Sequence, residues 1–126
     1  GGPSGVYSET YTGMPGVQSV AAFAAKGYVV LRVNPRGSIG YGLKFKAANF
    51  KDWGGGDYHD IMTGVDHVIA QGMADPEHMA VMGWSYGGYM TSWVISQTAR
   101  FKAAIVGAGI TNVWSMWGTN DVPTYL

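Results

Sequence analysis

Cysteine is absent from this chain of 126 residues, and charged side chains are scarce. Without cysteine the chain has no disulfide and no cysteine-ligated metal site, and its compartment stays undecided. Only 13% of the residues are charged, and the 8 basic residues balance the 8 acidic ones. This neutral balance predicts neither a nucleic-acid partner nor an anionic membrane surface. No apolar run approaches the length that crosses a bilayer, so we expect no membrane insertion.

Histidine is present only at His59, His67 and His78, and none lies beyond residue 78. These spacings are not those of metal ligands, so we predict no metal site. The glycine pair in Gly107-Ala108-Gly109 lacks the third glycine and the Gly-Lys-Ser/Thr of a phosphate-binding loop. We therefore expect no cofactor.

The hydrophobic pattern alternates between helical and extended segments. Nearly continuous apolar and β-branched runs predict strands at residues 28–33, 79–84 and 103–106. Apolar spacing predicts helices at residues 17–26, 43–50, 57–71 and 87–98. Alternating helices and strands indicate parallel βαβ units, and hence an α/β fold with a mostly parallel sheet and flanking helices.

The segment Gly83-Trp84-Ser85-Tyr86-Gly87 contains the pattern Gly-x-Ser-x-Gly. In this pattern a serine lies on a sharp strand-to-helix turn, which exposes its hydroxyl. A chain with 20 glycines also produces glycine-rich turns without any catalytic role. The predicted strand before the motif and the predicted helix after it favour the catalytic interpretation, so Ser85 is the candidate nucleophile.

Five segments, taken in order, resemble the catalytic domain of the prolyl oligopeptidase family of serine peptidases, particularly its acylaminoacyl-peptidase and dipeptidyl-peptidase branches. They are Gly1-Gly2-Pro3; Arg36-Gly37-Ser38 with Gly40-Tyr41-Gly42; Trp53-Gly54-Gly55 with Asp57 and Asp60; Gly83 to Tyr89; and Asn120-Asp121-Val122-Pro123. The resemblance implies an α/β-hydrolase fold and a peptide, acyl-peptide or ester substrate.

An acyl-enzyme on Ser85 needs donors for the developing oxyanion. The backbone N–H of Tyr86, at the start of the next helix, is the first candidate. The resemblance points to the backbone N–H of Gly2 as the second. Candidates for an apolar substrate pocket are Trp84, Trp114, Met116 and Trp117, together with the Tyr86 side chain, whereas core packing is an equal alternative for Trp114 and Trp117.

The catalytic triad is incomplete in this sequence. In α/β-hydrolases the order along the chain is Ser, then Asp or Glu, then His. After Ser85 the chain has only Asp121 and no histidine. The resemblance places the triad Asp and His on later strands that these residues do not include. We therefore interpret residues 1–126 as a fragment of a peptidase catalytic domain.

His59 is the histidine that the predicted fold puts at the edge where Ser85 emerges, so it is a hypothetical substitute base. The alternative is an exposed histidine in the first turn of a helix. For Arg36, a structural ion pair with Asp57 or Asp60 is favoured over binding of a substrate carboxylate. Asp57 and Asp60 themselves fit ordinary charges at a helix start.

Two functional interpretations remain open. The chain is the catalytic segment of a serine hydrolase, or it is a truncated module that performs no chemistry alone. Unpaired strand edges favour association between copies of a chain. We therefore predict a homo-oligomer formed through those edges.

Overall fold

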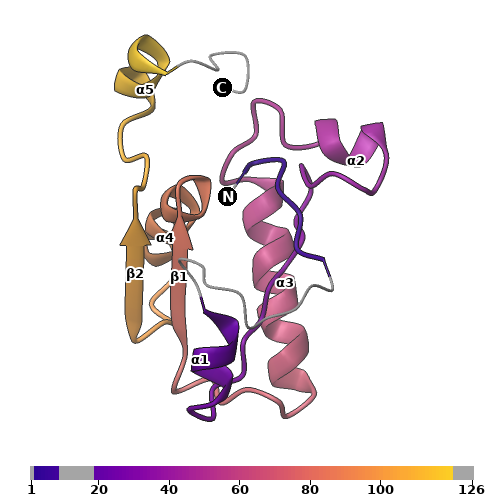
Figure 1. The fold of residues 1–126 in the computed structure, drawn as a ribbon, viewed down its shortest axis with the longest axis vertical. Coiled ribbons are helices and arrows are strands. Elements are labelled where there is room, and N and C mark those ends of the chain that lie inside the picture. The colour runs from indigo at the N-terminus through magenta and orange to yellow at the C-terminus, as the bar shows by residue number, and fades with distance from the viewer. Residues whose placement is uncertain (1, 9–18, 121–126) are drawn as a thin grey trace.

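The computed structural model describes residues 2–8 and 19–120, and these form a small parallel sheet with flanking helices (Figure 1). The predicted positions Gly1, 17–18 and 121–123 lie outside the described residues. The elements are α1 (Val20–Ala24), α2 (Leu43–Ala47), α3 (Gly56–Ala70), β1 (Ala80–Trp84), α4 (Tyr86–Gln97), β2 (Ala103–Gly107) and α5 (Val113–Thr119).

Strands β1 and β2 are parallel neighbours, and their register runs from Ala80 opposite Ala103 to Trp84 opposite Gly107. Helix α4 makes the crossover between them, which gives the βαβ unit expected from the alternating pattern. The carboxyl ends of both strands lie at the same edge of the sheet. Ser85 follows β1 at this edge.

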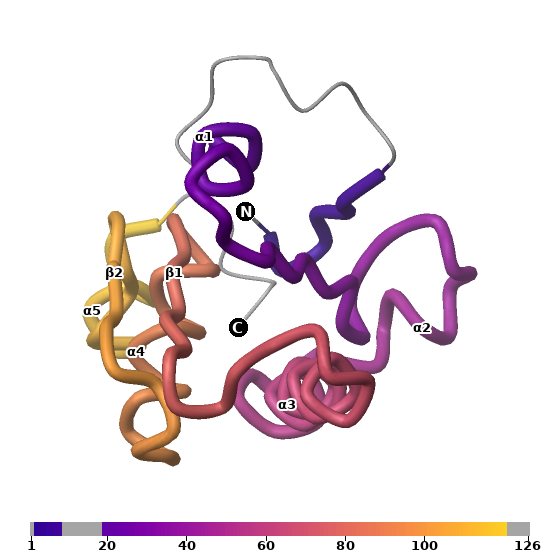
Figure 2. Tube along the Cα trace, turned by 90° about the horizontal axis from the view of Figure 1, so that it is seen from below, coloured from indigo at the N-terminus to yellow at the C-terminus, as the bar shows by residue number. Residues whose placement is uncertain are grey.

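The strand predicted at residues 28–33 is not formed. Among the described residues the sheet consists of β1 and β2 alone, and Figure 2 shows the segment that follows α1 running apart from both strands. Its side chains at Tyr28 and Val29 are more than half exposed, while Val33 lies close to Gly64 of α3. A parallel strand requires a neighbour for its backbone hydrogen bonds, and none of the described segments provides one here.

The core lies between α3 and α4. Met62 of α3 packs with Tyr86, Met90 and Val94 of α4, and aromatic side chains from Trp53 and Tyr89 cover this cluster. Both helices bury one apolar face, as their sequence spacing predicts. This packing fixes the start of α4, and with it the turn at Ser85, against the first turn of α3.

The shorter helices are stabilised locally. The side chains of Ser19 and Asn112 accept hydrogen bonds from backbone N–H groups in the first turns of α1 and α5. The helices predicted at 17–26 and 43–50 are shorter than expected, and no helix was predicted for the residues that form α5.

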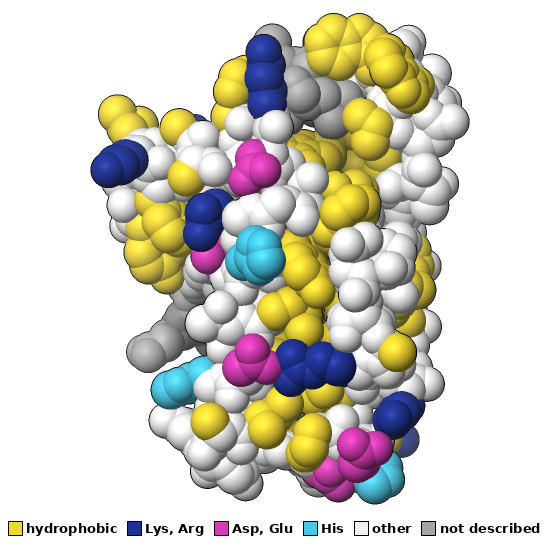
Figure 3. Space-filling view, turned by 180° about the vertical axis from the view of Figure 1, so that it is seen from behind, with side chains coloured by type: hydrophobic (Ala, Val, Ile, Leu, Met, Phe, Trp, Pro, Cys, Tyr) yellow, Lys and Arg dark blue, Asp and Glu magenta, His cyan; other side chains and the backbone are white. Residues whose placement is uncertain are grey.

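Much of the apolar surface remains exposed (Figure 3). Hydrophobic side chains gather along the middle of the face in this view, interrupted by charged groups. In the sheet, Met82, Ile105 and Val106 are exposed. Within the described residues, no helix combines the length and apolar character needed to cross a membrane.

Candidate active site

Ser85 occupies a strained turn between β1 and α4. Its backbone has φ 59° and ψ −120°, a conformation that side-chain-bearing residues rarely adopt. The Ser85 N–H donates to the carbonyl of Gly107 over 2.9 Å, and the Ser85 carbonyl accepts from the N–H of Tyr89 over 3.0 Å. The side chain is exposed at the carboxyl edge of the sheet. This is the conformation that a nucleophile elbow requires.

The glycines around Ser85 permit close backbone contacts. A Cβ atom on Gly83 would overlap the carbonyl oxygen of Gly87, and one on Gly88 would overlap the carbonyl oxygen of Gly107. A Cβ on Gly87 would meet open space. Gly83 and Gly88 are therefore required by the turn, whereas Gly87 contributes the backbone against which Gly83 packs.

The N–H groups at the start of α4 include the predicted oxyanion donor, the N–H of Tyr86. The Ser85 side chain does not cap this helix. In the part of the chain that the structure describes, the Tyr86 N–H has no hydrogen-bond acceptor. Its role as an oxyanion donor remains a prediction.

The second predicted donor, Gly2, lies in the exposed N-terminal segment. Ser4 in this segment accepts a hydrogen bond from the N–H of Ile39, which attaches the segment to the loop before α2. No hydrogen bond joins Gly2 to the elbow among the described residues. The role of Gly2 remains a prediction.

The Tyr86 side chain points into the core instead of lining a pocket, so its predicted contribution to a pocket wall is wrong. It is only 8% exposed and forms edge-to-face and tilted ring contacts with Trp53 and Tyr89, with centroids 4.9 and 5.8 Å away. Its hydroxyl donates a hydrogen bond to the Oδ2 of Asp57 and accepts a 3.4 Å hydrogen bond from the side chain of Asn49. Burial, with the Asp57 carboxylate beside it, raises the pKa of the Tyr86 phenol well above its ordinary value.

Asp57, expected from the sequence to be a helix-start charge or an ion-pair partner of Arg36, instead accepts the hydrogen bond from the Tyr86 hydroxyl. Its side chain is fully buried, and its Oδ1 accepts 2.8 Å hydrogen bonds from the N–H groups of Gly54 and Tyr58. Burial and the nearby Asp57 charge also raise the pKa of Tyr89. The position of Asp57 three residues after a glycine, in the first helical turn, was the only local signal of this role.

The predicted substrate-pocket residues do not come together around Ser85. Trp84 is about half exposed, and its ring lies against Gly107 at the end of β2. Trp114 is 89% exposed and Trp117 57%, so neither belongs to the core that the described residues form, while Met116 is half-buried on the same helix, α5. A substrate-binding role for these side chains remains a prediction.

No described residue hydrogen-bonds to the Ser85 hydroxyl. His59 is exposed on α3, where the centroid of its ring lies 5.5 Å from that of Tyr58. His78 precedes β1, at the opposite end of the strand from Ser85, and its Nδ1 atom forms a 2.7 Å hydrogen bond with the Oδ2 atom of Asp75. The described residues contain no cluster of ligands that fits a metal ion.

Arg36 forms a bidentate ion pair with Asp60, as predicted from the sequence. Its Nε and Nη2 atoms lie 2.9 and 2.8 Å from the two carboxylate oxygens, and its backbone N–H also donates to Asp60. These hydrogen bonds hold the pKa of Asp60 below its ordinary value. The pair connects the loop after residue 33 to α3, and the Arg36 guanidinium is bound to Asp60.

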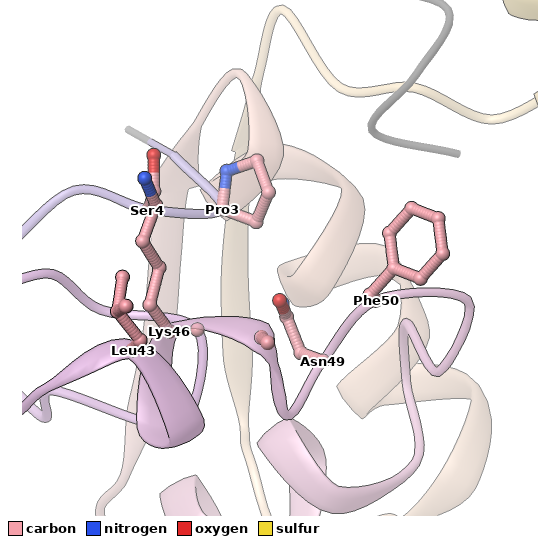
Figure 4. A pocket seen from close by; sticks show the side chains of 8 residues that line it. Pro3, Ser4, Leu43, Lys46, Asn49 and Phe50 are labelled. Carbon is pink, nitrogen blue, oxygen red and sulfur yellow. The ribbon is translucent and has the colours of Figure 1, made fainter.

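An open pocket of about 410 Å³ lies between the N-terminal segment and α2 (Figure 4). Pro3 and Ser4 lie across from Asn49 in this view. Asn49 therefore contributes both to this pocket and to the hydrogen bond with Tyr86. Apart from Lys46, no lining side chain is charged.

A family model described as the prolyl oligopeptidase family matches residues 16–125. The chain belongs to the prolyl oligopeptidase family. The predicted resemblance is thereby confirmed, and the parallel sheet, crossover helix and serine elbow are those of an α/β-hydrolase.

Individual relatives support this membership. An uncharacterized peptidase, YuxL, of Bacillus subtilis is 45% identical over 97% of the chain, which corresponds to 18% of the relative. Acylamino-acid-releasing enzyme 1 of Oryza sativa is 36% identical over 99% of the chain and 16% of the enzyme. The acylaminoacyl peptidase of Pyrococcus horikoshii superposes with a TM-score of 0.84 and 34% identity, over 99% of the chain and 20% of that structure. The chain thus spans about a fifth or less of these relatives.

Proposed function

We propose that this chain carries the nucleophile of a serine peptidase, with Ser85 forming the acyl-enzyme and the Tyr86 N–H binding the oxyanion. The observation that carries the proposal is the strained, exposed conformation of Ser85 between β1 and α4. Family membership and the peptidase relatives support the same chemistry.

In the acylation step the Ser85 Oγ attacks the substrate carbonyl carbon and forms a new C–O bond. The hydroxyl proton passes to a base, and the carbonyl oxygen becomes an oxyanion facing the Tyr86 N–H. Collapse of this intermediate breaks the bond to the amine or alcohol, which leaves with a proton from the base. Water then hydrolyses the ester on Ser85 by the same route.

This mechanism requires a general base, and no described residue forms a hydrogen bond with the Ser85 hydroxyl. His59 remains the hypothetical substitute within the chain, on the same helix as Asp57. Free imidazole added to the solution supplies the same chemical group. If His59 acts as the base, His59→Ala lowers the acylation rate and imidazole restores it.

The proposed substrates are peptides and acyl-peptides, with esters as simpler substrates for the same acyl transfer. Relatives named as acylamino-acid-releasing enzymes and dipeptidyl peptidases support this class. The test is hydrolysis of a p-nitrophenyl ester with and without imidazole. We expect the wild type to release a burst of one p-nitrophenolate per chain, and Ser85→Ala to show no burst. Equal release by the wild type and by Ser85→Ala would contradict the proposal.

A second proposal is that copies of this chain associate through the sheet. A two-stranded sheet is rarely stable alone, and exposed strand edges pair readily with another chain. The exposed side chains of Met82, Ile105 and Val106 favour a second copy as the partner. Light scattering should detect a dimer or larger species, reduced by Ile105→Lys; a single monomeric species at all concentrations would contradict it.

A further inference from the structure

The buried carboxylate of Asp57 has no role in the chemistry described so far. It is 0% exposed, although an ionised carboxylate is costly to bury unless it is fully hydrogen-bonded. Three donors satisfy it: the N–H groups of Gly54 and Tyr58, and the hydroxyl of Tyr86. Two of these are local, whereas Tyr86 is 29 positions away and directly follows the nucleophile.

We propose that Asp57, with Asn49, is a positioning residue that holds Tyr86 and thereby fixes the oxyanion N–H and the strained backbone of Ser85. This inference rests on the proposed function and deepens it. Tyr86 carries both groups concerned: its side chain is anchored at α3, and its backbone N–H is the candidate oxyanion donor. Any rotation at Tyr86 changes the direction of that N–H.

The anchor is rigid on the Asp57 side. Asp57 lies in the first turn of α3, where the N-terminal end of the helix stabilises a negative charge. Its Oδ1 is held by two backbone N–H groups, so Oδ2 has a fixed direction towards Tyr86. Asn49, which is also buried, contacts the same hydroxyl from the start of the loop that follows α2.

The elbow needs such an anchor because a residue at φ 59° and ψ −120° persists only where its surroundings hold it. The hydrogen bond from the Ser85 N–H to Gly107 holds it from β2. The hydrogen bond from the Tyr89 N–H to the Ser85 carbonyl holds it from α4. The hydrogen bond between Tyr86 and Asp57 is a third constraint on the turn and connects it to α3.

The alternative is that this link only stabilises the fold. Amide hydrogen exchange separates the two roles, because it reports local opening at each hydrogen-bonded N–H. The informative amides are those of Ser85 and Tyr89, and the Thr98 amide, bonded to Val94 at the other end of α4, is the internal reference. The variant is Tyr86→Phe, and the matched control is Val65→Ala, which opens the α3 core outside the cluster that contains Tyr86.

We expect Tyr86→Phe to speed exchange at Ser85 and Tyr89 by about tenfold relative to Thr98, as loss of a hydrogen bond to a charged group predicts. Val65→Ala should change all three amides by the same factor. Equal acceleration in both variants would overturn the proposal. If Tyr86→Phe does not fold, the double variant Tyr86→Phe with Asp57→Asn removes the unpaired buried charge and carries the same prediction.

A fluorophosphonate probe gives a second readout. We expect Tyr86→Phe to lower the rate of covalent reaction at saturating probe by about tenfold, with the probe concentration at half-maximal rate unchanged. An unchanged maximal rate would overturn the proposal. If the wild-type chain does not react at all, the proposed function fails, whereas the exchange experiment still decides whether Asp57 positions the elbow.

Discussion

The folded chain should be less stable when residue 85 carries a Cβ atom than when that residue is glycine. At φ 59° and ψ −120° a Cβ atom is strained, and such backbone strain costs about 1–3 kcal/mol. Glycine removes the strain but loses about 0.5–1 kcal/mol to its greater freedom in the unfolded chain. The net prediction is that Ser85→Gly is more stable than Ser85→Ala by about 1 kcal/mol. Both variants lose the hydroxyl, which makes no helix-capping bond, so the comparison isolates the Cβ atom.

The matched control is Ser96, an exposed residue inside α4 without positive φ. There, in the last turn of α4, Ser96→Gly should be less stable than Ser96→Ala by about 0.5 kcal/mol, because glycine has the lower helix propensity. Urea unfolding of the four variants measures both differences, and thermal unfolding should show shifts in opposite directions. If glycine is the less stable residue at both positions, the turn at Ser85 is not strained and the argument for an elbow fails.

Two further predictions concern the surroundings of the elbow. Gly83→Ala should destabilise the chain by about 3 kcal/mol because its Cβ overlaps the backbone of Gly87, whereas Gly87→Ala, which meets open space, should be neutral or slightly stabilising in urea unfolding. The lowered pKa of Asp60 contributes stability that is present above the ordinary aspartate pKa of 3.8 and is lost as the pH falls below it. Stability measured from about pH 5 to pH 3 should therefore fall more steeply in the wild type than in Arg36→Met; parallel curves would contradict this role of the ion pair.

The elbow could be predicted because its determinants are local in the sequence. Gly83, Ser85 and Gly88 lie within six consecutive residues, and the strand before them and the helix after them have clear patterns. The crossover to β2 follows from the same alternation. These features do not depend on any distant part of the chain.

The sequence-based predictions fail where contacts between distant segments determine the structure. Residues 28–33 have the composition of a strand, but hydrogen-bonded partners determine whether a strand forms, and no described segment pairs with them. The role of Asp57 depends on a residue 29 positions away, which no local pattern identifies. Trp114 is exposed on α5 although its side chain is typical of a core, because no described segment covers that helix.

The most direct test of the central claim is covalent labelling of the folded chain with a fluorophosphonate, with the adduct located by mass spectrometry. We expect an adduct on Ser85, formed faster when imidazole is added and absent in Ser85→Ala. Thr91, Ser92 and Ser96, which share α4 with the elbow, serve as internal references and should remain unmodified. No adduct on Ser85 at any imidazole concentration, or equal modification of Ser92 and Ser96, would contradict the assignment of Ser85 as the nucleophile.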